Sequence, residues 1–145
     1  MTAGDISTNL RTYLLTVSAV TTQASGGIFP DVLPQNPSFP AVVIRVISST
    51  PQHALGQTTQ LKMTRFQVDC YAQTRLAANA TSEVIRKNLD HYSGAAGDDT
   101  IDVSLTETDR YDYEPPKDAG DSRSSGRYLA STEYLIVHDV PAVST

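Results

Sequence analysis

The sequence predicts an α+β fold, a mostly antiparallel sheet of four to five strands with two helices packed on one face. Two segments rich in β-branched residues, 39–51 and 64–72, follow one another, and a helix-forming run begins at Thr74. Further strand-like segments come after that helix. Consecutive strands with few helices, in place of strict alternation, are typical of α+β domains. The expected order is α-(β)-β-β-α-β-β in a single domain over residues 1–145, a length that can bury one core.

The chain should begin with an amphipathic helix that Asp5 caps. Apolar residues follow the cap at three- and four-residue steps and form a stripe that should face the sheet: Ile6, Leu10, Leu14 and Val17. Residues 26–40 contain four prolines, which exclude a helix and favour an extended connection. At most a short edge strand is expected over 28–32.

The next two segments should form the centre of the sheet. The first is β-branched on both faces at its start, as in a strand covered on both sides: Val42, Ile44 and Val46 against Val43 and Ile47. After a long polar hairpin loop at 52–60, the second alternates, with Phe66, Val68 and Cys70 opposite Arg65, Gln67, Asp69 and Tyr71. Cys70 is the chain's one cysteine and lies on the apolar face, so we expect a buried packing residue and not a nucleophile.

Thr74 is the predicted N-cap of the second helix, and Gly94 is expected to end it in a left-handed conformation. Its buried side should consist of Ala77, Thr81, Val84, Ile85, Leu89 and Tyr92. Ile101, Val103 and Leu105 then alternate strictly with polar residues. A last strand over 128–137 should place Leu129, Leu135 and Val137 on one face and Tyr134 and Ile136 on the other.

Acidic residues are concentrated between Asp98 and Asp121. This window holds nine acidic residues and two basic ones, a net charge of −7 in a chain whose total is −5. A protein that grips nucleic acid needs a basic stripe instead. The window is therefore either a solvated acidic face or a wall past which DNA slides without adhering.

No constellation for catalysis or cofactor binding is expected, because the histidines and acids lack the required spacing. The three histidines, His53, His91 and His138, form no i, i+4 pair and should lie on the surface. The carboxylates of Asp98, Asp99 and Asp102 lack the spacing and central glycine of a calcium loop. No apolar run is long enough to cross a bilayer and no signal peptide is evident, which predicts a soluble protein that is not secreted.

A polar segment at about 114–127 is long for a hairpin connection and has almost no side chains to bury. Loops of this length in a compact domain are usually functional or disordered. We call it the arm. It is either a passive solvent loop or an arm that becomes ordered on a neighbouring protein.

The order and spacing of several short motifs, over nearly the whole chain, resemble the tail-completion or tail-terminator family of long-tailed bacteriophages. These motifs are Gly-Gly-Ile-Phe-Pro at 26–30, Leu-Pro-Gln at 33–35, Phe-Pro-Ala-Val-Val at 39–43, Thr-Pro-Gln-His at 50–53, Phe-Gln-Val-Asp-Cys-Tyr-Ala at 66–72 and Tyr-Asp-Tyr-Glu-Pro at 111–115. A short N-terminal helix and a second helix ending near Asn88-Leu89 complete the pattern. The chain departs from it at Tyr71, where the family often has tryptophan, and in the long polar insertion after Pro115.

The resemblance implies a structural virion protein and not an enzyme. Such a protein would be assembled in the host cytoplasm into a hexameric ring that caps the head-proximal end of the tail tube. It would contact the tail-tube protein and the head-completion proteins of the neck, while DNA passes its channel without specific binding. The expected protein-interface residues are Tyr111, Tyr113, Lys117, Arg123 and Arg127. The expected channel-facing acids are Asp98, Asp99, Asp102, Asp109 and Asp112.

Two alternatives remain open at this stage. One is another head–tail adaptor or neck protein, which would bind the portal side instead of the tube. The other is a small metal-dependent cytoplasmic enzyme that uses the acids between Asp98 and Asp112.

Overall fold

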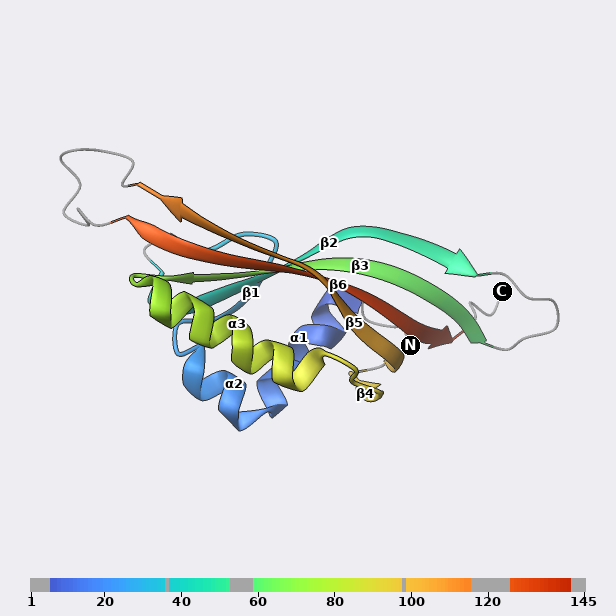
Figure 1. The fold of residues 1–145 in the computed structure, drawn as a ribbon. Helices are drawn as coiled ribbons and strands as arrows, with labels where there is room; N and C mark the ends of the chain where they lie inside the picture. The colour runs from blue at the N-terminus through green and yellow to red at the C-terminus, as the bar shows by residue number, and fades with distance from the viewer. Residues whose placement is uncertain (1–5, 36, 53–58, 98, 116–125, 142–145) are drawn as a thin grey trace.

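The computed structural model of the chain describes residues 6–35, 37–52, 59–97, 99–115 and 126–141. These residues form three helices and six strands (Figure 1). The helices are α1 (Ile6–Thr16), α2 (Ser18–Gln23) and α3 (Arg75–Leu89). The strands are β1 (Gly27–Pro30), β2 (Ala41–Gln52), β3 (Thr59–Ala72), β4 (Gly94–Ala96), β5 (Asp99–Glu114) and β6 (Arg127–Pro141).

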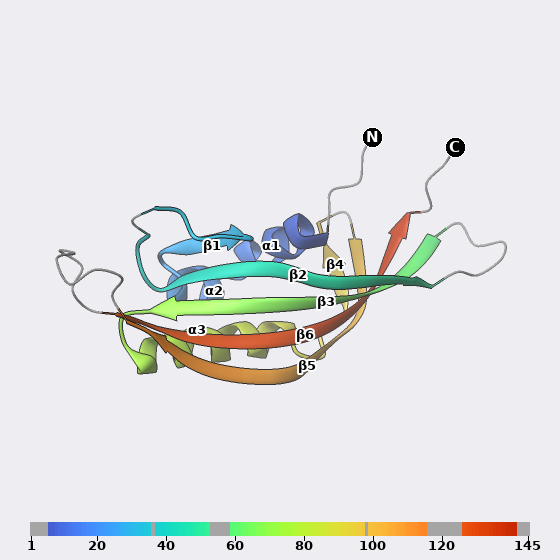
Figure 2. The ribbon, with the colours of Figure 1, turned by 90° about the horizontal axis from the view of Figure 1, so that it is seen from above.

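The strands form one sheet in the order β1-β2-β3-β6-β5-β4, in which β1 is parallel to β2 and every other pair is antiparallel. All three helices lie on the same side of the sheet (Figure 1). Figure 2 looks onto the opposite side, which no described helix covers and which we call the open face. The predicted α+β class is confirmed, whereas the predicted four to five strands and two helices are too few.

The first predicted helix is in fact two helices, because Val17 between them has an extended backbone. Its N–H still bonds to Leu14 O at 3.2 Å and its carbonyl starts α2 by accepting from Val20 N at 3.0 Å. This turn lets both Leu14 and Val20 enter the core. A continuous helix would direct the second stretch away from the sheet.

The chain enters β1 through Gly26, which has no space for a side chain. A Cβ there would lie 2.0 Å from the carbonyl oxygen of Ser38, and the Gly26 N–H already bonds to Pro40 O at 2.8 Å. Only glycine allows the two backbone segments to come this close. The contact brings the start of β1 beside the start of β2, which explains the parallel pairing.

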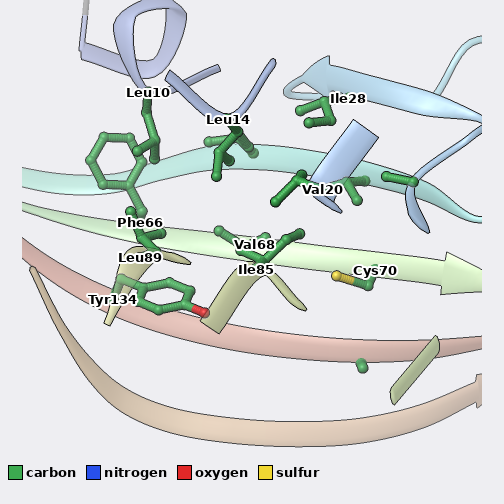
Figure 3. Packing of buried hydrophobic residues seen from close by; sticks show 14 of the residues in the cluster. Leu10, Leu14, Val20, Ile28, Phe66, Val68, Cys70, Ile85, Leu89 and Tyr134 are labelled. Atoms are coloured by element: carbon green, nitrogen blue, oxygen red, sulfur yellow. The ribbon is translucent and has the colours of Figure 1, made fainter. Parts of the chain in front are cut away.

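The core lies between the helices and the covered side of the sheet (Figure 3). As predicted, β3 directs Phe66, Val68 and Cys70 into it. Tyr134 and Ile136 share a face of β6 as predicted, and the structure shows that this face is the buried one. The helices contribute Leu10, Leu14, Val20, Ile85 and Leu89. The interpretation of Cys70 as a packing residue is confirmed, because it is buried among these side chains.

The start of α3 is as predicted, but its end is not. Thr74 Oγ1 accepts from Ala77 N at 3.1 Å, the expected N-cap. The helix ends at Leu89 and not at Gly94, because the next two residues bond to β5 instead. The carboxylate of Asp90 accepts from Thr106 N at 3.0 Å, and His91 N donates to Ser104 O at 2.6 Å.

A bulge overturns the strict alternation predicted for β5, and the burial on both faces predicted for β2 holds only at its start. In β5 the register shifts between Ile101 and Val103, so Ile101 is buried in the core while Leu105 is exposed on the open face. In β2 the register shifts after Val46, and Val46 and Ile47 are both exposed. Only the first four residues of β2, from Ala41 to Ile44, are buried on both faces.

Candidate assembly interface

The two ends of the arm are fixed where β5 ends and β6 begins. Glu114 and Arg127 are register partners, and the Arg127 Nε–H donates to Glu114 Oε2 at 2.7 Å. The Arg127 guanidinium also lies 4.9 Å from the centroid of the Tyr71 ring. Neighbouring Tyr113 and Tyr128 have ring centroids 4.8 Å apart. We call these five residues the arm base.

The geometry of the arm base depends on glycine at position 126. A Cβ there would lie 2.4 Å from the carbonyl oxygen of Glu114 and 2.4 Å from the Tyr113 hydroxyl. The two strands can therefore stay close up to the point where the arm leaves them. The partly exposed ion pair of Glu114 with Arg127 contributes little stability by itself, so its role here is to hold the ends of β5 and β6 together.

The predicted interface residues do not form one cluster. Tyr111 and Tyr113 lie on the helix side of β5, where both are about half exposed. Arg127 lies on the open face with Tyr71. Lys117 and Arg123 are outside the described residues. Because strand residues alternate between faces, the tyrosines and Arg127 can contact different partners.

The predicted channel acids are also divided between the two faces. Asp109 lies on the helix side, where its carboxylate pairs with the Arg86 guanidinium of α3 and accepts from Thr132 Oγ1 at 2.8 Å. Asp112 is opposite Leu129 on the open face and is exposed. Position 98 and the side chain at 99 are not described.

Asp102 is beside Asp139 of β6, a pairing that the sequence did not suggest. Burial raises the pKa of Asp102 above its ordinary value, and the neighbouring Asp139 carboxylate raises it further. Two carboxylates in contact favour a proton on one of them. The pair therefore holds a proton more readily than a lone aspartate does, close to where β5 begins.

The open face carries an ion-pair network that sequence reasoning missed. Asp69 is almost fully buried although no described helix covers it. Arg45 Nη2 lies 3.3 Å from Asp69 Oδ2, and the Gln67 amide donates to both carboxylate oxygens of Asp69 at 3.0 and 3.1 Å. Further along, Arg65 pairs with Glu107 at 3.1 Å. Cross-strand register brings these residues together, and no local sequence signal could have found them.

Apolar side chains continue the open face beyond that network. Met63, Val137 and Val103 are successive register partners across β3, β6 and β5, and Leu135 and Leu105 lie beside them. All five are half-buried or exposed. The sequence predicted that Leu135 and Val137 share a face, but the bulge in β5 decides that Leu105 joins them.

Among the described residues, no three His, Cys, Asp or Glu side chains are placed to hold a metal ion. Burial raises the pKa of the Cys70 thiol far above its ordinary value, which opposes thiolate formation. His91 is exposed as expected, but the surface prediction for His138 is wrong, since it is buried with Nε2 2.8 Å from Thr64 Oγ1. His53 is outside the described residues, and no helix among them is long and apolar enough to span a membrane.

Comparisons with known proteins show a related fold and a family. Among solved structures, the chain is similar to one in the virion of a native gene transfer agent particle, with a TM-score of 0.60 over 92% of this chain and 94% of that one. The two are 8% identical, so this likeness concerns the fold alone. No significant match was found among curated proteins. Residues 8–119 match the family model described as Tail completion protein gp17, and the chain therefore belongs to this tail-completion family.

Proposed function

We propose that the protein caps the head-proximal end of the phage tail tube as a hexameric ring and docks the tail to the neck. As a member of a tail-completion family, it is a structural protein of the virion tail. The family match over residues 8–119 carries the proposal. The structure supports it with the ion pair and aromatic contact of the arm base and with a sheet face that no described helix covers.

A ring of this kind ends a polymer because its two sides differ. One side contacts the last ring of the tube, while the other does not accept another tube subunit and instead meets the neck. Identical subunits joined by heterologous contacts form such a closed ring when the rotation closes after a whole number of copies. No chemical step is needed, and the specificity lies entirely in the surfaces.

The arm makes the contact with a neighbouring protein in this proposal. Its sequence offers charged and small residues and almost no apolar ones, so its contacts would be polar and would form on assembly. Arg123 and Lys117 suit acidic partners. Tyr111 and Tyr113, exposed beside the arm base, suit a separate and more apolar contact.

The acids of the open face would turn towards the channel. Asp102 and Asp112 are the described candidates, whereas Asp109 is neutralised by Arg86. Repulsion from DNA phosphates acts only within about 8 Å at physiological salt. That range is sufficient to keep a passing genome from adhering to the wall.

Tail assembly without the protein tests the proposal. Overlong tubes in its absence, shortened when purified protein is added, are the expected result. Tubes of normal length that fail to join heads would instead identify another head–tail adaptor. Stabilisation of the fold by a divalent cation, abolished by replacing Asp98, Asp99 and Asp102 together, would favour the metal-dependent enzyme.

The arm is tested separately by combining Arg123→Ala with Arg127→Ala. We expect the double variant to fold but to lose capping, and we expect tryptic cleavage at Lys117 and Arg123 to slow after assembly. Equal cleavage before and after assembly, together with normal capping by the double variant, would reduce the arm to a passive loop.

A further inference from the structure

Two strand edges in the described part of the chain have no partner strand over most of their length. β1 pairs only with Ala41–Ile44 of β2, and β4 pairs only with Asp99–Ile101 of β5. The outer edges of β2 from Arg45 onward and of β5 from Asp102 to Glu114 therefore lie beside no other described strand. Such edges are templates for pairing with another chain.

The fold blocks one part of the β5 edge and leaves another open. Ser104 O and Thr106 N are bonded to His91 and Asp90, as described above. A bulge follows between Thr106 and Thr108, and from Thr108 to Glu114 the register with β6 is unbroken. Because a bulge inserts one residue, the backbone groups that face the edge change from even to odd positions. Beyond the bulge they belong to residues 109, 111 and 113.

The edge of β2 is open in a comparable way. The carbonyl oxygens of Pro40 and Ile44 accept from Gly26 N at 2.8 Å and Asp31 N at 2.9 Å, so the even residues of this segment face the edge. Val46 is the next residue in that series and lies beyond the end of β1. Pro51, which has no N–H to donate, limits the open stretch at its far end.

Exposed apolar side chains concentrate on these two stretches. Of the eight large hydrophobic residues that are exposed in the described structure, Val46, Ile47, Tyr111 and Tyr113 lie on them. Val46 is opposite buried Phe66, and Tyr111 is opposite buried Ala130, so both side chains lie on the helix side of the sheet. If the two edges paired, these side chains would meet on one face as an aromatic and β-branched pair.

Strand directions and charges also match. β2, β3, β6 and β5 alternate in direction, so β5 runs opposite to β2. A second copy in the same orientation would therefore bring its β2 antiparallel to β5. Of the three acids in residues 108–114, Asp109 and Glu114 pair with Arg86 and Arg127 of the same subunit. Exposed Asp112 is the acid that would face Arg45, the one charged residue of the stretch 45–50.

From these observations we infer that residues 108–112 at the β5 edge of one subunit pair with residues 45–49 at the β2 edge of the next, with Val46 opposite Tyr111 and Arg45 opposite Asp112. The pairing ends at Arg45, because β1 occupies the β2 edge from Ala41 to Ile44. The contact is heterologous, because different edges meet, and it can repeat around a ring. The two open stretches are offset along the strands. A closed sheet requires such a stagger between strands. The inference rests on the proposed ring and names the surfaces that would close it.

Disulfide trapping tests the contact directly. Cys70 is buried, so Val46→Cys and Tyr111→Cys would supply the reactive thiols. After mild oxidation on tail tubes, the double variant should give a non-reducing ladder in multiples of 15.7 kDa. A mixture of the two single variants should give dimers, and neither single variant alone should do so. Leu15→Cys with Leu76→Cys, which are exposed on helices, is the matched control and should give no ladder.

Three results would overturn the inference or its basis. Rings seen by mass photometry without cross-links in the double variant would place the subunit contact elsewhere. A dimer of Tyr111→Cys alone would indicate that two β5 edges pair with each other. No ring of the unmodified protein on tail tubes would refute the proposed function, and the inference with it.

A second substitution tests the contact without thiols. Val46→Asp replaces the apolar contact with Tyr111 by a carboxylate within the proposed subunit contact, and it should abolish ring assembly while the melting temperature of the free subunit stays unchanged. Val32→Asp, at another exposed valine, should assemble normally. Equal assembly by the two variants would show that the β2 edge takes no part.

Discussion

Replacement of Phe66 by alanine should remove a large part of the stability of the fold. Phe66 is fully buried at the middle of β3, opposite Tyr134, and its ring points towards Leu10 of α1 (Figure 3). Truncation loses the transfer free energy of the ring and leaves a cavity between the helices and the sheet. Such Phe→Ala changes cost about 3–5 kcal/mol. Domains are typically stable by about 5–15 kcal/mol, so the variant should fold only marginally.

Urea unfolding followed by circular dichroism measures this loss. We expect a lower midpoint at an unchanged slope, and a melting temperature lower by roughly 6–20 °C, from about 2–4 °C per kcal/mol for a chain of this size. Tyr111→Ala is the matched control, because Tyr111 is largely exposed and its loss should change stability by no more than about 0.5 kcal/mol. A loss below about 1 kcal/mol for Phe66→Ala would refute the assignment of Phe66 to the centre of the core.

Three further predictions concern titration and reactivity. Asp102→Asn should raise the melting temperature at pH 7, because burial and Asp139 raise the pKa of Asp102 and so disfavour its charged form in the fold. This gain should vanish below the ordinary pKa of 3.8, where Asp102 is protonated in both the folded and the unfolded state. Asp90→Ala should lower the melting temperature at pH 7, because the Thr106 N–H lowers the pKa of Asp90; this loss should shrink as the pH falls from 3.8 through the lower pKa of the folded state. These assignments would be contradicted if the two variants changed the melting temperature in the same direction at pH 7, or if either change did not shrink on acidification. Cys70 should react with a thiol reagent only after unfolding, and Cys70→Ala should leave assembly intact; rapid labelling of the native protein would show that the thiol is accessible.

The features that follow from short-range periodicity or capping could be predicted from the sequence. The alternation of Phe66, Val68 and Cys70 identified the core face of β3, and Thr74 identified the start of α3. The arm is a prediction from composition, and residues 116–125 lie outside the described part of the chain. The tail-completion family was recognised by the order of short motifs, and the family match confirms it. These signals are local, because side-chain direction in a strand and the first turn of a helix depend on a few neighbouring residues.

Only the tertiary structure decided which residues share a surface. The first bulge in β5 exposes Leu105 on the open face, which simple alternation from Ile101 cannot show, and the second bulge returns Asp109 to the helix side beside Arg86. The burial of His138 and the ion pair of Arg45 with Asp69 likewise depend on strands that are distant in sequence. A bulge inserts one extra residue and moves every later residue of the strand to the opposite face. Whether a strand accommodates a bulge depends on the strands with which it pairs. The positions of the open edges are therefore a property of the assembled sheet.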